Sequence, residues 1–298
     1  MAKRRIVDPH HHLWNLEAGY NYPWLQDLPL GEGVLGPIGP IARSYLLEDL
    51  LADTADYALE KSVHIEAVPA DPVRETQWIQ ALSDSRGMPS ASVGFAALNA
   101  PDVEAVLEAH AARPCVRGIR HILNWHKNPG LTFTDRSDLM TDEAWLAGFG
   151  LLDKYGFSFD LQIYPSQFAD AVRLAERFPE TLIILNHTGM PVDRDEAALE
   201  CWRDGIVALA DCDNVVAKIS GLGMVDWKWS TKTVRPFVLH VIESFGTDRT
   251  MFASNFPVDK LYSSFTTLYQ AFEAIVADFS DGEQDRLFRL NAVKHYRL

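Results

Sequence analysis

The sequence predicts an α/β protein built as a single (β/α)8 TIM barrel. Eight short apolar segments alternate with segments of helical spacing, and this alternation is typical of parallel βαβ units. A chain of 298 residues has a normal length for one such barrel, so we expect one domain over residues 1–298. A doubly wound open sheet is the alternative. No Gly-x-Gly-x-x-Gly turn follows the first apolar segment, which removes the usual reason to choose that sheet.

The expected strands are short and apolar. The first contains Ile6 and Val7 and should end close to Pro9, because proline cannot donate a ladder hydrogen bond. Seven more are expected at residues 61–67, 91–98, 116–122, 157–163, 181–187, 215–220 and 250–254. Together with the first segment they supply the eight strands that close a barrel.

The expected helices follow these strands in turn. Leu46, Leu47 and Leu50 recur at helical spacing and indicate an amphipathic helix over residues 45–59. Further helices are expected at residues 74–84, 101–112, 142–155, 166–178, 196–210, 231–245, 265–278 and 283–295.

A long loop separates the first strand from the first helix. It spans residues 15–43, and its section 31–40 is rich in Gly and Pro and is not expected to be helical. Tyr20, Tyr22 and Trp24 place three rings close together near its start. We expect this loop to cover the barrel mouth, either as a functional lid or as a packed cover.

Composition and charge exclude several classes of partner. The net charge of −14 makes nucleic acid or an anionic membrane surface an unfavourable partner. No stretch approaches the roughly 20 apolar residues of a membrane span, and the two-residue apolar run near the start is too short for a signal peptide. The three cysteines, Cys115, Cys201 and Cys212, lack metal-ligand spacing and are expected to be reduced. We therefore expect a cytoplasmic protein that acts on a small molecule, anionic or polyhydroxylated.

Three consecutive histidines end the first expected strand. Residues two apart share a face of a strand, so Asp8, His10 and His12 should point one way and His11 the other. Two imidazoles next to a carboxylate on one face are typical of a pair of metal ligands with an acidic residue close by. A run of surface histidines is the alternative explanation.

Polar side chains also end most of the other expected strands. In a (β/α)8 barrel the active site lies at these carboxyl ends. A lysine within a buried strand, Lys218, is costly unless it is paired or functional. His64 is expected to be a core or rim residue, whereas His110, His240 and His295 lie on expected helices as surface or packing residues. The polar residues at the strand ends are His64, Glu66, Arg120, Gln162 with Tyr164 just beyond, His187, Lys218, Ser220, Ser254 and Asn255.

Five segments together resemble a known family. They are Asp8-Pro-His-His-His-Leu-Trp14, Val116-Arg-Gly-Ile-Arg120, Leu185-Asn-His-Thr-Gly-Met-Pro191, Val216-Ala-Lys-Ile-Ser-Gly-Leu222 and Leu290-Asn-Ala-Val-Lys-His-Tyr296. In this order they resemble the amidohydrolase superfamily, and within it the "amidohydrolase 2" branch of sugar lactonases and 2-pyrone-4,6-dicarboxylate lactonase. The resemblance covers essentially the whole chain and is not specific for the substrate.

The resemblance implies roles for individual residues. His10 and His12 match the family's first-strand histidine pair, and His187 matches its later strand-end histidine. Arg120 matches an arginine that holds anionic or carbonyl oxygens of the substrate. The family has an aspartate after the eighth strand, as general base or metal ligand, whereas this chain has Asn255. An amide cannot take up a proton, so this departure bears directly on the mechanism.

Two mechanisms fit these residues. In the first, His10, His12 and His187 bind one Zn²⁺, which lowers the pKa of a bound water, and Asn255 orients the water or the substrate carbonyl. In the second, no metal binds, the histidines polarise a lactone carbonyl directly, and another group activates water. Asp259 is a possible substitute base. Of the two, we expect the metal-assisted version.

The leading functional hypothesis is hydrolysis of a cyclic ester. Arg120 would clamp a carboxylate or carbonyl oxygen with bidentate donors, and Gln162, Lys218, Tyr164 and the aromatic loop around Trp24 would complete the pocket. A decarboxylase of aromatic acids is the second hypothesis. The third is a barrel that binds a ligand and has lost catalysis with the change to asparagine.

Overall fold

The computed structural model describes residues 3–28, 30 and 33–298. Eight parallel strands form one sheet in the order β1 to β8, as predicted for a (β/α)8 barrel. The strands are β1 (Arg5–His11), β2 (Ala58–Ile65), β3 (Ala91–Phe95), β4 (Val116–Ile122), β5 (Ser158–Gln162), β6 (Ile183–Leu185), β7 (Val215–Ile219) and β8 (Thr250–Phe252). The predicted fold class is confirmed.

The barrel closes through the segment that follows β8. The amide of Asn255 donates to the carbonyl of His10 at 2.8 Å, and the amide of His12 donates to the carbonyl of Phe256 at 2.7 Å. These bonds join the last strand to the first. They also place Asn255 next to the histidines of β1.

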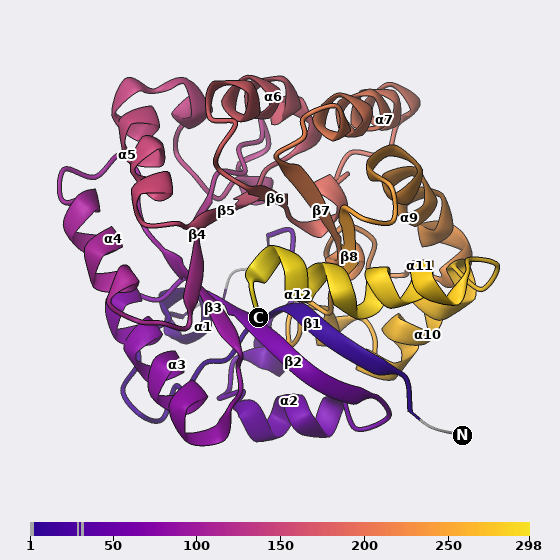
Figure 1. Ribbon diagram of the computed structural model, residues 1–298, viewed down its shortest axis with the longest axis horizontal. Helices are drawn as coiled ribbons and strands as arrows, with labels where there is room; N and C mark the ends of the chain where they lie inside the picture. Colours follow the sequence, from indigo (N-terminus) through magenta and orange to yellow (C-terminus); the bar gives the residue numbers. More distant parts are fainter. Residues whose placement is uncertain (1–2, 29, 31–32) are drawn as a thin grey trace.

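Helices surround the strands on the outside (Figure 1). The α-helices are α1 (Pro23–Gln26), α2 (Leu47–Asp53), α3 (Pro72–Arg86), α4 (Val103–Ala111), α5 (Glu143–Lys154), α6 (Phe168–Arg177), α7 (Glu196–Ala210), α8 (Leu222–Val225), α9 (Thr231–Phe245), α10 (Phe265–Ile275), α11 (Asp281–Asp285) and α12 (Asn291–Tyr296). Short 3-10 segments are η1 (Gly39–Ile41), η2 (Pro129–Leu131), η3 (Leu139–Thr141), η4 (Pro165–Gln167), η5 (His187–Gly189) and η6 (Asp259–Leu261). A π-helical segment, η7 (Arg286–Leu290), connects α11 and α12.

Two sequence predictions need correction. The helix predicted over 45–59 ends at Asp53, because Ala58 and Leu59 pair with Arg5 and Ile6 as the start of β2. The section 31–40 was predicted to be non-helical, but residues 39 and 40 belong to the short helix η1. Its proline lies in the first turn, where the missing amide costs no intrahelical hydrogen bond. Residues 31 and 32 lie outside the described residues.

The end of the chain closes one end of the barrel. In Figure 1, α12 crosses in front of the strands. Ala292 and Tyr296 pack against an apolar cluster inside the barrel that includes Val7 and Met251. The side-chain amide of Asn291 donates to the backbone carbonyl of Thr250 at 2.7 Å, so this is the end at which the strands begin. The polar residues lie at the opposite end of the barrel, where the strands finish.

Among the described residues, no helix is both long and apolar enough to cross a membrane. The barrel core instead consists of apolar side chains from the strands and from the inner faces of the helices. Trp145 and Phe149 of α5, for example, pack against Phe159 of β5.

We predict opposite effects for two neighbouring glycines of α5. A Cβ at position 148 would lie 2.0 Å from the carbonyl oxygen of Leu98, which is backbone and cannot move aside cheaply. Gly148→Ala should therefore lower the free energy of unfolding by about 3 kcal/mol in urea titrations. The control is Gly150→Ala, whose Cβ would meet its nearest neighbour, a Phe178 ring atom, at 3.4 Å. It should leave stability unchanged or raise it by up to about 1 kcal/mol, since alanine favours a helix over glycine. Equal effects of the two would contradict this packing.

Candidate active site

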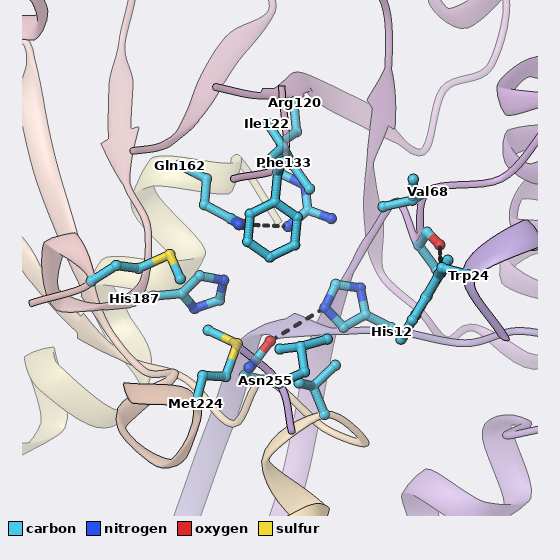
Figure 2. A pocket seen from close by; sticks show the side chains of 14 residues that line it. His12, Trp24, Val68, Arg120, Ile122, Phe133, Gln162, His187, Met224 and Asn255 are labelled. Atoms are coloured by element: carbon cyan, nitrogen blue, oxygen red, sulfur yellow. Dashed lines mark hydrogen bonds between the residues drawn. The ribbon is translucent and has the colours of Figure 1, made fainter. Parts of the chain in front are cut away.

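The strand ends bring most of the polar residues together at one end of the barrel. A cavity of about 150 Å³ opens there, and its polar lining residues are His12, Arg120, Gln162, His187 and Asn255. Figure 2 shows His12 and His187 on opposite sides, with Asn255 between them and Arg120 beside Gln162. These five come from five different strands or the segments that follow them, which is the arrangement expected of a barrel active site.

The three histidines form a compact cluster. The ring centroid of His10 lies 5.1 Å from that of His12 and 4.5 Å from that of His187. Burial lowers the pKa of all three well below the ordinary value of an imidazole, and nearby positive charges act in the same direction. The cluster is therefore neutral at physiological pH.

Each of the three imidazoles is held through its Nδ1 atom. His12 Nδ1 lies 2.8 Å from the carbonyl oxygen of Ile65, and His187 Nδ1 lies 3.0 Å from the hydroxyl of Ser220. A carbonyl only accepts, so the proton of His12 is on Nδ1 and its Nε2 carries a lone pair. His11 points elsewhere: its Nε2 lies 3.0 Å from the hydroxyl of Ser62 on β2.

His10 has a different partner. Its Nδ1 lies 3.0 Å from Nζ of Lys218, which also donates to Asp160 and, at 2.8 Å, to the hydroxyl of Tyr296. Burial lowers the pKa of Lys218 to about 8, against the opposing charge of Asp160, so the ammonium form still predominates at pH 7. An ammonium only donates, so the proton of His10 is on Nε2. That Nε2 atom is buried and has no partner among the described residues.

Asn255 lies beside His12. Its side-chain amide is 3.3 Å from His12 Nε2, and its backbone has a φ of 57°, a left-handed conformation that asparagine tolerates. The amide atom nearest His12 Nε2 is the oxygen Oδ1, and with the proton of His12 on Nδ1 both atoms are acceptors, so this contact leaves the lone pair of Nε2 free. Asp259 lies behind Asn255 and does not line the cavity, and burial raises the pKa of its carboxyl to about 7.

Arg120 is fixed by its neighbours. Its Nε donates to Oε1 of Glu66 at 2.6 Å, its Nη2 to the carbonyl of Glu66 at 2.5 Å, and its Nη1 to Oε1 of Gln162 at 2.9 Å. Gln162 in turn donates to Asn124 at 3.1 Å. Each Nη atom keeps one further N–H, so the guanidinium can still donate two hydrogen bonds into the cavity.

The remaining predicted site residues occupy different places. Trp24 lines the cavity, and its indole N–H donates to the carbonyl of Ala67 at 2.8 Å. Tyr164 is buried outside it, with its hydroxyl bonded to the carbonyl of Leu131 at 2.6 Å. Lys218 is also fully buried and lies beneath His10 rather than in the cavity wall. The Asp8 carboxylate accepts from the amide and hydroxyl of Ser254, at 2.9 and 2.6 Å, and thereby ties β1 to the end of β8.

The family model described as "Amidohydrolase" matches residues 7–298. The chain belongs to the amidohydrolase family. It is 42% identical, over 100% of both chains, to the uncharacterized protein y4mH of Sinorhizobium fredii. It is 28% identical to an L-fucono-1,5-lactonase of Burkholderia multivorans, over 98% of this chain and 96% of the relative. The predicted resemblance is thus confirmed, and the protein is a hydrolase.

A solved structure of a relative contains a metal. The crystal structure of an amidohydrolase from Burkholderia multivorans with bound zinc superposes on this chain with a TM-score of 0.83, at 26% identity and over 98% of this chain and 99% of that one. Our sequence prediction placed a zinc ion on His10, His12 and His187. The donor atoms of this amidohydrolase can therefore be tested against that expectation.

The three histidines do not fit a zinc ion as they are arranged. Within residues 3–28, 30 and 33–298, no group of three or more His, Cys, Asp or Glu side chains is placed to share one metal. The bond from Lys218 puts the proton of His10 on Nε2, so the nitrogen that faces the cluster has no lone pair to give. Asn255 supplies a neutral amide where a carboxylate would favour a dication.

The sequence prediction of this site omitted several supporting residues. Glu66 was noted at its strand end but not assigned to the site, although it fixes Arg120. Asp160 shares a strand face with Gln162, and this spacing could have identified it as a partner for the buried lysine. Tyr296 carries no local signal, because only the fold brings the end of the chain beneath His10.

A buried carboxyl behind Arg120 gives a pH prediction. Glu75 accepts from the amide of Ala67 at 3.2 Å and lies 3.7 Å from His64, and burial raises its pKa to about 8. The folded state therefore holds this proton at pH values where the unfolded chain has lost it. Stability contributed by the group falls as pH rises from its unfolded pKa of about 4.5 toward 8.

Glu75→Gln removes this titration. Relative to the natural protein, the variant should gain at least about 1 kcal/mol of unfolding free energy between pH 5 and pH 8, measured in urea at each pH. Glu108→Gln, an exposed change on α4, is the matched control and should show no such trend. A difference between Glu75→Gln and the natural protein that stays flat across this range would contradict the prediction.

Proposed function

We propose that this amidohydrolase hydrolyses a cyclic ester without a metal ion. The observation that carries the proposal is the convergence of a neutral imidazole with a free lone pair, His12, and a buried guanidinium, Arg120, on one cavity. A general base and a donor to a developing oxyanion are the two groups that ester hydrolysis needs. The lactonase relative of Burkholderia multivorans supports the choice of a lactone over other esters.

Arg120 is proposed to bind the carbonyl oxygen of the lactone. Two N–H groups of its guanidinium remain available to the substrate. Glu66 and Gln162 hold the guanidinium in place, so the side chain does not need to reorganise during the reaction. Attack at the carbonyl carbon places negative charge on this oxygen, and the guanidinium stabilises that charge more strongly than it stabilises the ground state. His187, on the other side of the cavity, is proposed to orient the substrate.

His12 is proposed to activate the water. Its Nε2 accepts one proton of the water as the water oxygen bonds to the carbonyl carbon, and Oδ1 of Asn255, 3.3 Å from that nitrogen, accepts a hydrogen bond from the other proton. When the tetrahedral intermediate collapses, the ring C–O bond breaks and the same proton passes from His12 to the leaving oxygen. The product is an open-chain hydroxy acid, and the imidazole returns to its neutral form.

The other predicted site residues are proposed either to contact the substrate or to position the residues that do. Gln162 and Trp24 contact the substrate, because both line the cavity. Lys218 positions His10 from below, and Tyr164 supports the loop that carries Leu131. We also propose that the protein works in the cytoplasm, in keeping with its free cysteines.

The proposed function is tested with His12→Ala. The natural protein should hydrolyse at least one lactone of a panel that contains sugar lactones and alkyl or aryl lactones, followed by acid release at constant pH. His12→Ala should lower kcat/KM by at least about 100-fold, because the general base is lost. His240→Ala, on α9, is the matched control and should keep full activity. Absence of any turnover, or full activity of His12→Ala, would overturn the proposal.

Chelation tests the role of metal separately. Protein purified without added metal should contain far less than one zinc per chain by elemental analysis. Its lactone turnover should be unchanged after dialysis against EDTA, because the tautomer of His10 leaves no third imidazole for the ion. Loss of activity on chelation, restored by zinc, would show that the histidines rearrange around a metal.

A further inference from the structure

We infer that the substrate is a cyclic ester with an apolar body, such as an alkyl- or aryl-substituted lactone, and not a polyhydroxylated sugar lactone. This inference rests on the proposed function, because it concerns the same cavity. It replaces the expectation of an anionic or polyhydroxylated substrate that the sequence suggested.

The walls of the cavity are apolar. Nine of its fourteen lining residues are hydrophobic, and Figure 2 shows them around the polar groups. Trp24, Leu35, Ile122, Met224 and Val258 are examples from five separate segments of the chain. Such walls gain from contact with carbon and hydrogen atoms and offer nothing to a hydroxyl.

Apart from Nε2 of His12, Nε2 of His187 and two N–H groups of Arg120, which the proposed reaction uses, few polar atoms at the cavity remain free to bind hydroxyl groups. Gln162 is engaged with Arg120 and Asn124, and the indole of Trp24 donates to the backbone. His12 is engaged through Nδ1 with the backbone, and the lone pair of its Nε2 is needed for the attacking water. A sugar lactone carries several hydroxyls, and each one buried without a partner costs about 1–3 kcal/mol. An apolar lactone presents only its ester oxygens, which Arg120 can satisfy.

The cavity mouth extends the apolar surface. Val68 and Phe133 line the cavity and are 46% and 43% exposed, which is unusual for large hydrophobic side chains. Val68 also has a φ of 55°, which is strained for a β-branched residue, and its amide donates to Glu66 at 2.7 Å. A substituent on the lactone ring would cover both side chains as it leaves the cavity.

Size and charge agree with this assignment. The cavity of about 150 Å³ matches the volume at which an apolar cavity holds a benzene-sized ring. Among the described lining residues, Arg120 is the only one with a permanent charge, and its salt bridge to Glu66 offsets that charge. Because Glu66 already offsets the charge of Arg120, the substrate does not need an anionic group, and a neutral ester carbonyl suits the site.

The test compares two classes of lactone on the full chain. We expect kcat/KM for dihydrocoumarin or δ-nonalactone to exceed that for glucono-1,5-lactone and L-fucono-1,5-lactone by at least about tenfold. Equal or faster turnover of the sugar lactones would overturn this inference and leave the proposed function intact. Turnover of no lactone at all would overturn both.

Two variants test whether the apolar cavity walls cause the preference for apolar lactones over sugar lactones. Met224→Gln keeps the side-chain length but adds polar atoms, and it should lower kcat/KM for the apolar lactone by about tenfold, mainly through KM, without lowering it for the sugar lactones. Met88→Gln, half-buried before β3 and outside the cavity, is the matched control and should have no effect. If Met224→Gln does not fold, Phe133→Ser at the exposed mouth should shift the preference in the same direction. Equal losses for both lactone classes in the variant that folds would overturn the inference.

Discussion

The active site depends on a lysine that is buried beneath it. Lys218 is surrounded by Asp160, the hydroxyl of Tyr296 and the imidazole of His10, and all four side chains are buried. Taking an ammonium and a carboxylate out of water is costly, and the pair is tolerated because both have additional hydrogen-bond partners. The tyrosine hydroxyl accepts from the lysine and donates to the aspartate at 2.8 Å. The same network decides which nitrogen of His10 carries its proton, and so whether the histidine cluster can take a metal.

A second buried ion pair supports the opposite side of the cavity. Glu66 holds Arg120 through its carboxylate and its backbone carbonyl, and Gln162 fixes the third edge of the guanidinium. The arginine is therefore rigid before a substrate arrives, and its charge is already balanced. One side of the cavity thus orients an oxygen, the other presents a neutral base, and the apolar walls between them exclude water. This division explains how a chain with a net charge of −14 can hold a site where, among the described lining residues, the only permanent charge is positive.

The periodicity of apolar residues predicted helices and strands well where the packing of the folded protein follows the same period. The strand at 116–122 and the helices at 196–210 and 231–245 match the structure to the residue. The helix predicted at 45–59 was too long, because pairing with β1 draws Ala58 and Leu59 into a strand against their local pattern. The positions of polar residues at the ends of the expected strands also predicted correctly that His12, Arg120 and Gln162 lie at the carboxyl end of the barrel. These positions could not reveal that Lys218 and Tyr164 lie outside the cavity, or that Phe133 of a loop and Met224 of the short helix α8 form its walls, because these facts depend on tertiary packing.

The contact between Lys218 and Tyr296 joins β7 to the last helix of the chain. During synthesis on a ribosome, the strands and both cavity histidines emerge well before this tyrosine does. Until α12 docks, the lysine and aspartate lack the hydroxyl that bonds to both of them, and the barrel is open at the end where its strands begin. The hydrogen-bond network beneath the active site is therefore completed by a side chain that is made after all eight strands. A nascent chain can have the shape of the barrel before it has the chemistry of the enzyme.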